Sequence, residues 1–159
     1  MKYLLCLDQG TTGSTALILD QELRVISRGY CEVVQHYPQP GWVTHDPEQI
    51  FESVDQAVCQ ALASANIEPS QLAAIGITNQ RETTVLWERS SGKSVHGAIV
   101  WQCRRSAPIT TRWRSQGLEP EIQKRTGLLL DPYFSASKLV WLFEEFPQLR
   151  QRAQAIKQL

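Results

Sequence analysis

The 159-residue sequence lacks the features that define several classes of protein. Its longest apolar runs, such as Leu4–Leu7 and Ala98–Trp101, are far shorter than the roughly 20 residues that a membrane-spanning helix needs. Its formal net charge is zero, so no overall field favours nucleic acid or an anionic membrane. We therefore expect no nucleic-acid or membrane partner, and a small molecule held by a local site.

The sequence shows no closely spaced pair of cysteines, and we expect no secretory leader. Cys6, Cys31, Cys59 and Cys103 form no C-x-x-C pair, which argues against a zinc site or a thioredoxin-like motif. We expect Cys6 and Cys59 to be buried small apolar residues. The N-terminus has no long apolar region and no small-residue cleavage site, so it does not read as a signal peptide. A cytoplasmic location is therefore expected.

Three common catalytic patterns are absent. The sequence has neither the G-x-x-x-x-G-K-[ST] of a Walker P-loop nor the H-E-x-x-H of zinc proteases. Its three histidines have no nearby acid and nucleophile, so a Ser/His/Asp hydrolase is not supported.

The 42% hydrophobic and 20% charged residues are ordinary for a globular domain, and the length fits one domain.

The order of patterned segments predicts an α/β domain. The strongest signal is a helix that begins at Asp46, a suitable N-cap, followed by Pro47. One face of this helix is predicted to carry its apolar side chains: Ile50, Phe51, Val54, Val58, Ala61 and Leu62. Strands are predicted over 3–7, 15–19, 24–35, 72–78 and 97–102, the first three as an antiparallel meander and the last two buried. Further helices are predicted over 107–115, 119–125 and 135–146, and a last helical pattern runs to the end with no terminator, as in a piece of a larger architecture.

The loop after the first strand could bind phosphate. Gly10 to Ser14 lies at a predicted hairpin tip, where backbone amides and the hydroxyls of Thr11, Thr12 and Ser14 are donors suited to phosphate oxygens. A carboxylate beside phosphate is repulsive unless a cation lies between them, so Asp8 indicates a magnesium–nucleotide complex. A simple hairpin turn remains the alternative.

Four later residues could bind a polyol. Arg81 and Glu82 stand in a short polar link between two apolar runs, where they offer donors and acceptors to vicinal hydroxyls or form a trivial surface ion pair. Trp101 ends an apolar strand and is either core or a ligand wall. Tyr133 follows an Asp-Pro turn and, alone, is an ordinary half-buried aromatic residue.

Five segments, in this order, resemble the FGGY carbohydrate kinases: LDQGTTGS, QHYPQPGWVTHDPEQI, GITNQRETTVLW, AIVWQCRR and TGLLLDPYFSASKL. They extend from Leu7 to about Leu139, and NQRET with PYFS is typical of members that phosphorylate glycerol rather than a pentulose. The resemblance implies an actin-like, ribonuclease-H-like fold. Met1–Leu159 would be an incomplete N-terminal domain, without the C-terminal nucleotide-binding domain.

The resemblance also implies a reaction, in which the γ-phosphoryl group of Mg-ATP passes to a glycerol hydroxyl and gives glycerol 3-phosphate. By motif, Asp8 corresponds to the carboxylate near the magnesium. The residues that correspond to the phosphate loop are Thr11, Thr12 and Gly13.

The glycerol site is implied by the same motifs. Arg81, Glu82 and Tyr133 correspond to glycerol hydrogen-bonding residues, and Trp101 corresponds to the apolar wall behind the carbon chain. The full-length enzyme is expected to form a homo-oligomer.

The sequence departs from the family in its loop and in its length. Gly13 and Thr15 replace the serine and arginine of the usual T-T-S-S-R, so a guanidinium that would stabilise transferring phosphate is missing. Thr44 replaces a glutamate, a change of little expected consequence. The family's general base lies downstream of the part that matches Leu159, so no catalytic residue is assigned here. We expect the isolated chain to fold weakly and to lack appreciable kinase activity.

Alternative interpretations remain open at this point. In the first interpretation, the chain is the N-terminal part of a glycerol-phosphorylating kinase. It is then either a truncated product or half of a split enzyme that a complementary downstream segment completes. In the second interpretation, the chain is a non-catalytic polyol-binding or regulatory module. A kinase for another polyol is less well supported, because NQRETT and DPYFS are both glycerol-type motifs.

Overall fold

The structure of the chain is a computed structural model that describes residues 2–155. The chain forms two compact units, and each is built from several stretches of sequence. The first unit comprises Met1–His36, His45–Arg81 and Val85–Ala98. The second unit comprises Tyr37–Thr44, Glu82–Thr84 and Ile99–Leu159.

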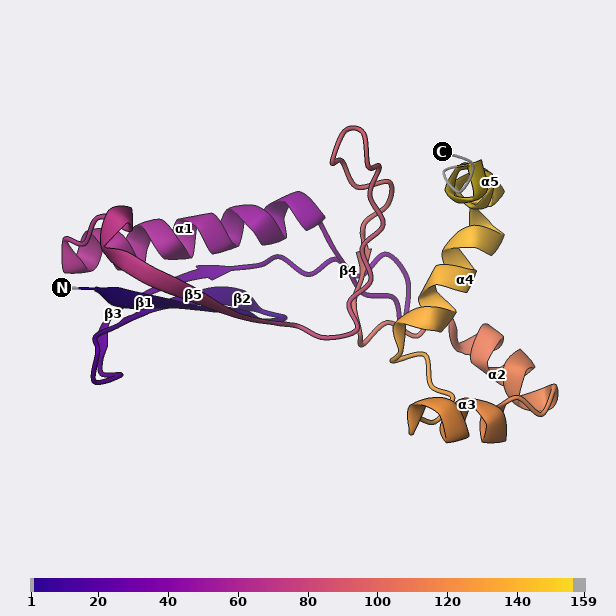
Figure 1. Ribbon diagram of the computed structural model, residues 1–159. Helices are drawn as coiled ribbons and strands as arrows, with labels where there is room; N and C mark the ends of the chain where they lie inside the picture. The colour runs from indigo at the N-terminus through magenta and orange to yellow at the C-terminus, as the bar shows by residue number, and fades with distance from the viewer. Residues whose placement is uncertain (1, 156–159) are drawn as a thin grey trace. The chain divides into compact units, whose positions relative to one another are not determined.

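The first unit contains a four-stranded mixed sheet (Figure 1). Its strands are β1 (Tyr3–Gln9), β2 (Gly13–Leu19), β3 (Val25–Glu32) and β5 (Leu72–Asn79), in the order β3-β2-β1-β5. The first three strands form the predicted antiparallel meander, and β5 runs parallel to β1. The predicted α/β class is therefore confirmed.

Helix α1 (Pro47–Ala65) lies along this sheet and begins where predicted (Figure 1). Asp46 is the N-cap, and its Oδ1 accepts a hydrogen bond from the amide of Glu48 at 2.9 Å. The predicted apolar face is partly wrong, because Phe51 is 73% exposed.

The face of α1 that meets the sheet carries small residues, namely Ser53, Ala57 and Ala61. A Cβ atom at Gly29 of β3 would lie only 1.9 Å from the carbonyl oxygen of Ala57. The helix therefore packs so closely on the sheet that small side chains have to face it, and a rule based on large apolar residues misplaces the contact. Cys59 on this helix is exposed, which contradicts the expectation that it is buried.

Strand β5 follows a short 3₁₀ helix, η1 (Pro69–Gln71), and differs from the prediction. It pairs with β1 and forms one edge of the described sheet. Residues 73–79 are exposed, so the strand is not buried on both faces. Ile75 and Ile77 are 58% and 73% exposed. An apolar run cannot by itself distinguish a buried central strand from an uncovered edge strand.

The helices of the second unit lie close to their predicted positions. They are α2 (Ala107–Ser115), α3 (Glu119–Thr126), α4 (Ser135–Glu145) and α5 (Pro147–Ala155). The last part of the predicted C-terminal helix, residues 156–159, lies outside the described residues. Among residues 2–155, no helix is long and apolar enough to span a membrane.

Two short strands, β4 (Thr44–His45) and β6 (Ala98–Ile99), pair with each other. Strand β6 is much shorter than the predicted strand over 97–102, although Ala98, Ile99 and Val100 are fully buried as expected.

In the second unit, the Arg105 guanidinium lies 4.2 Å from the ring centroid of Trp42 and 4.9 Å from that of Trp141. Cation–π contacts of this kind help to hold a buried arginine without a carboxylate.

Candidate functional site

Asp8 and the loop after it lie at the carboxyl end of β1. The Asp8 side chain is exposed, and Thr15 of β2 is its direct cross-strand partner. The loop is closed by a hydrogen bond from the amide of Gly10 to the carbonyl of Gly13 at 2.9 Å. Thr12 is exposed and Thr11 half-buried, so the structure places these polar groups at one end of the sheet, with a carboxylate beside them.

Ser14 differs from its expected role in this loop, and Gly13 is closely approached by a side chain. Ser14 is buried, and its hydroxyl lies 2.7 Å from the hydroxyl of Ser53 on α1, so it is not a donor for phosphate. Gly13 does not have a positive φ. A Cβ atom there would lie 2.5 Å from the Tyr30 hydroxyl, so a larger residue would require the Tyr30 side chain to move.

A buried polar network behind the loop was not predicted from the sequence. The amide of Gln80 donates to the carbonyl of Gln9 at 2.7 Å, and its side-chain nitrogen lies 3.2 Å from both Gln9 Oε1 and His45 Nδ1. Burial lowers the pKa of His45, and the nearby His36 lowers it further. Neutral His45 accepts at Nδ1, so this network fixes the ends of β1 and β5 where the loop begins.

Arg81 belongs to the first unit, where it is the last residue of the segment His45–Arg81. Its side chain is exposed, and its guanidinium makes one long hydrogen bond, 3.5 Å, to the carbonyl of Asn79. Most of its donors are therefore available to a ligand.

Glu82 belongs to the second unit, where it is the first residue of the segment Glu82–Thr84. Its backbone is left-handed, with φ 65°. Its Oε2 atom accepts hydrogen bonds from the amide of Ser135 at 2.9 Å and from the Ser135 hydroxyl at 2.8 Å. Ser135 is the first residue of α4, and the N-cap Phe134 supplies no side-chain hydrogen bond. Glu82 provides this cap from a distant part of the chain.

Trp101 and Tyr133 are in contact within the second unit. Their ring centroids are 5.7 Å apart, with an interplanar angle of 64°. The amide of Trp101 donates to Thr83 Oγ1 at 3.3 Å, and the amide of Tyr133 donates to Asp131 Oδ1 at 2.8 Å. Since Thr83 follows Glu82, and Ser135 lies two residues after Tyr133, the second unit gathers Glu82, Trp101 and Tyr133.

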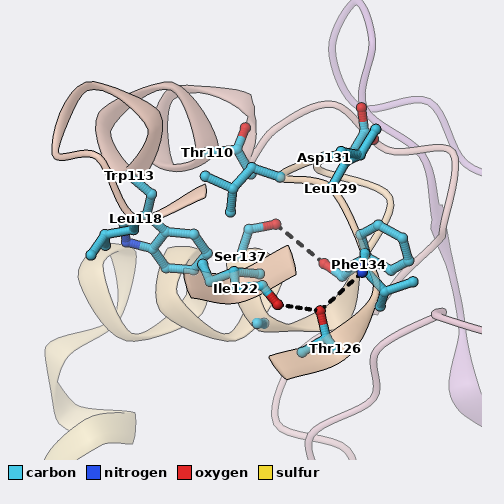
Figure 2. Close-up of a pocket in the computed structure, with 12 residues that line it drawn as sticks. Thr110, Trp113, Leu118, Ile122, Thr126, Leu129, Asp131, Phe134 and Ser137 are labelled. Carbon is cyan, nitrogen blue, oxygen red and sulfur yellow. Dashed lines mark hydrogen bonds between the residues drawn. The ribbon is translucent and has the colours of Figure 1, made fainter. Parts of the chain in front are cut away.

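Figure 2 shows a separate pocket in the second unit, with a volume of about 410 Å³. Trp113, Leu118 and Ile122 lie on one side of it, and Phe134 lies on the other (Figure 2). The lining is almost wholly apolar and includes none of the predicted polyol-binding residues. A pocket of this chemistry does not suit a small molecule that carries a hydroxyl on every carbon.

Asp8 is the predicted contact for a metal ion. Over residues 2–155, no group of three or more His, Cys, Asp or Glu side chains could enclose a metal ion. Magnesium bound with a nucleotide needs only one or two carboxylates, because phosphate oxygens and water complete its shell. An exposed Asp8 beside the hydroxyls of the loop fits a magnesium ion that arrives with phosphate.

Comparison with known proteins identifies relatives over nearly the whole chain. A family profile described as "FGGY family of carbohydrate kinases, N-terminal domain" matches residues 3–158. A glycerol kinase from Shewanella sp. (strain W3-18-1) is 51% identical over 152 residues, which are 96% of this chain and 31% of the relative. A glycerol kinase from Agrobacterium fabrum is 53% identical over 151 residues, 95% of this chain and 30% of the relative.

A solved structure has the same fold. The crystal structure of Plasmodium falciparum glycerol kinase with ADP matches with a TM-score of 0.89 and 31% identity, over 98% of this chain and 31% of the other. The chain thus spans about 31% of the length of the relatives it matches. With a family match over residues 3–158, the chain belongs to the FGGY family of carbohydrate kinases.

Proposed function

We propose that the chain is the N-terminal part of a glycerol kinase, which in its complete form transfers the γ-phosphoryl group of ATP to glycerol and gives glycerol 3-phosphate. The observation that carries this proposal is the cluster of Glu82, Trp101 and Tyr133 in the second unit. It combines a carboxylate, a phenol and an indole face, which suit a small polyol with polar hydroxyls and an apolar carbon chain.

Glu82 is suited to bind a hydroxyl group because only one of its carboxylate oxygens is used internally. Oε2 accepts both hydrogen bonds from Ser135, whereas Oε1 accepts none from residues 2–155. A carboxylate held in this way is already oriented, so little conformational entropy is lost when a hydroxyl donates to Oε1. The Tyr133 hydroxyl would supply a further hydrogen bond, and the Trp101 ring would exclude water from the carbon chain. The family motif assigns a further hydrogen bond to the Arg81 guanidinium.

At the other candidate site, Thr11, Thr12 and Gly13 would bind phosphate oxygens, and Asp8 would hold the magnesium ion that accompanies them. Magnesium neutralises negative charge on the phosphates. The Plasmodium falciparum glycerol kinase was crystallised with ADP, which supports a nucleotide ligand for the complete enzyme. The residues of this chain would position the two substrates, since phosphoryl transfer depends chiefly on position and charge.

The residues assigned on this chain bind ligand and include no general base, so we propose that turnover needs the part of the relatives' length that this chain does not span. The relatives are about three times as long, which supports this view.

We further propose that the complete enzyme is a cytoplasmic homo-oligomer. The four free thiols suit a reducing compartment.

Arg81→Ala tests the proposal. We would join the chain in frame to the remaining part of the Shewanella relative and measure the glycerol KM at saturating ATP. We expect at least a tenfold increase in KM, since a hydrogen bond from a charged group contributes about 1.5–3 kcal/mol. Arg89→Ala is the matched control, an exposed arginine of the same unit, and should leave KM unchanged. An unchanged KM in Arg81→Ala would refute the assignment.

A non-catalytic polyol-binding module is the second candidate, and Thr15 favours it because no guanidinium extends from this position toward the phosphate loop. Calorimetry of the isolated chain with glycerol, combined with turnover of the joined protein, separates the two. Saturable binding without turnover, even after Thr15→Arg, would identify a module. Turnover of the joined protein would identify an enzyme.

A further inference from the structure

Lys138 on α4 is fully buried, and its ammonium group is bound to two backbone carbonyls. Nζ donates to the carbonyl of Pro132 at 2.7 Å and also to the carbonyl of Tyr133. Lysine is almost never fully buried unless its charge has a partner. Among the described residues Lys138 forms no ion pair, so these carbonyls are its direct partners.

The two carbonyls belong to the peptide units on either side of Tyr133. The amide of Tyr133 is held as well, by Asp131 Oδ1 at 2.8 Å, and the amide of Phe134 donates to the carbonyl of Asp131 at 3.2 Å. The backbone at Tyr133 is therefore fixed from both sides. From this fixed backbone its ring contacts that of Trp101, with the two centroids 5.7 Å apart.

We propose that Lys138 is a positioning residue for the polyol site, which acts by holding the carbonyls of Pro132 and Tyr133 so that the Tyr133 ring is set against Trp101. This inference rests on the proposed function, because it takes Tyr133 and Trp101 as polyol-binding residues. Lys138 itself is buried and does not touch the ligand.

The charge of Lys138 gives this role a pH dependence. Burial lowers the pKa of Lys138 from 10.5 to about 8, and the ionisable groups that face it, Glu82, Cys103 and Asp131, oppose this shift. Two of these groups have cationic partners: Arg104 pairs with Asp131 at 3.3 Å, and Arg105 donates to the Cys103 sulfur at 3.0 Å. Below pH 8 the ammonium makes charge-assisted hydrogen bonds. Above it the neutral amine makes weaker ones.

The Pro132 carbonyl can be observed by itself, because Pro132–Tyr133 is the only Pro–Tyr dipeptide in the sequence. A chain labelled with ¹³C-carbonyl proline and ¹⁵N-tyrosine gives a single cross peak in a carbon-detected C′–N spectrum. We expect this peak to titrate with a midpoint near pH 8. Lys138→Met should abolish the titration, whereas Cys103→Ser, which removes the nearby thiol, should leave it in place.

Glycerol affinity of the same chain, measured by calorimetry from pH 6.5 to 9.5, is the second readout. In the wild-type chain we expect affinity to fall several-fold as pH rises through 8. Lys138→Met should bind glycerol about tenfold more weakly than the wild type at pH 7, without this pH dependence. Lys124→Met removes an exposed lysine of α3 and should match the wild type.

The outcomes separate this inference from the proposed function. Glycerol binding that is equally tight in Lys138→Met and wild type, or that does not change through pH 8, would overturn the positioning role and leave the proposed function intact. A Pro132 carbonyl that does not titrate would also overturn it. A carbonyl that titrates in a chain that binds no glycerol would contradict both the polyol site and the role of Lys138 in it. The wild-type titrations decide the matter even if Lys138→Met does not fold.

Discussion

Ser135 donates both its amide, at 2.9 Å, and its hydroxyl, at 2.8 Å, to one carboxylate oxygen of Glu82. The two residues are far apart in sequence, and the contact ties the polar link after β5 to the first turn of α4. A carboxylate is favoured at this end of a helix by the free amides and by the helix dipole. One side chain therefore stabilises the fold and presents its other oxygen to solvent.

Glu82 and Ser135 should be energetically coupled. In a double-mutant cycle of Glu82→Ala and Ser135→Ala, we expect a coupling of about 1–2 kcal/mol in the free energy of unfolding, because either change removes the hydrogen bond between the hydroxyl and the carboxylate. The hydrogen bond from the backbone amide persists in Ser135→Ala, so the cycle measures the hydroxyl contact. Urea denaturation followed by circular dichroism measures it. Strictly additive effects would show that the hydroxyl–carboxylate hydrogen bond contributes nothing to stability.

Gly29→Ala should destabilise the first unit strongly. The new Cβ atom would lie 1.9 Å from the carbonyl oxygen of Ala57, which is helix backbone and cannot turn aside. We expect a loss of about 2–3 kcal/mol in the free energy of unfolding, as for overpacked cores.

Gly76→Ala is the matched control for Gly29→Ala. It is also a strand glycine, but nothing lies within 4 Å of its Cβ position. We expect a change of no more than about 0.5 kcal/mol. Equal effects of the two substitutions would contradict the close packing of α1 on β3.

Lys138 should make stability rise with pH. Its pKa is about 8 in the folded chain against 10.5 for an ordinary lysine, so between these values the unfolded chain binds more protons. The free energy of unfolding should therefore increase across this range, by up to about 3 kcal/mol at about 1.4 kcal/mol per pKa unit. Comparison of the wild type with Lys138→Met in urea at several pH values tests this, and identical slopes would contradict it.

The rise of stability with pH helps to separate unfolding from a change at the glycerol site. Above pH 8 the fold gains stability from Lys138, whereas glycerol affinity is expected to fall. Unfolding therefore cannot account for a loss of affinity in that range, and a change in the position of Tyr133 can.

Thr15→Arg should improve phosphoryl transfer in the joined enzyme. Thr15 lies directly opposite Asp8 on the neighbouring strand, so a guanidinium at this position would reach the same end of the sheet as the phosphate loop. We expect at least a tenfold increase in kcat with an unchanged glycerol KM, since electrostatic groups of this kind contribute several kcal/mol to a transition state. Thr15→Gln is the uncharged control, and an equal increase there would exclude the charge as the cause.

Local signals in the sequence predicted much of the fold. Asp46 and Pro47 marked the start of α1 because capping chemistry depends only on neighbouring residues. The helices that begin at Ala107, Glu119 and Ser135 were predicted to within about one residue from their helical sequence pattern, which is also a local signal. Alternation and turn residues likewise predicted the β1–β2–β3 meander.

Contacts between distant segments were beyond the reach of such signals. The side of α1 that packs on the sheet is set by Gly29 on another element, and the exposure of β5 depends on what lies beside it in space. At the candidate site, family motifs indicated Glu82 and Tyr133, but the cap on Ser135 and the burial of Lys138 join residues that no local pattern connects. Lys138 would have been read from the sequence as an ordinary surface lysine of an amphipathic helix.

Strand β5 has a practical consequence for anyone who handles this polypeptide. Its outer edge has no strand partner in the part of the chain that the structure describes, and its eight residues include no charge and no proline. Natural edge strands usually carry such residues to prevent pairing with another molecule. In concentrated solution, solubility should therefore be limited by edge-to-edge association at Ile75 and Ile77, and a lysine introduced at Ile77 should keep samples monodisperse without altering the hydrophobic core.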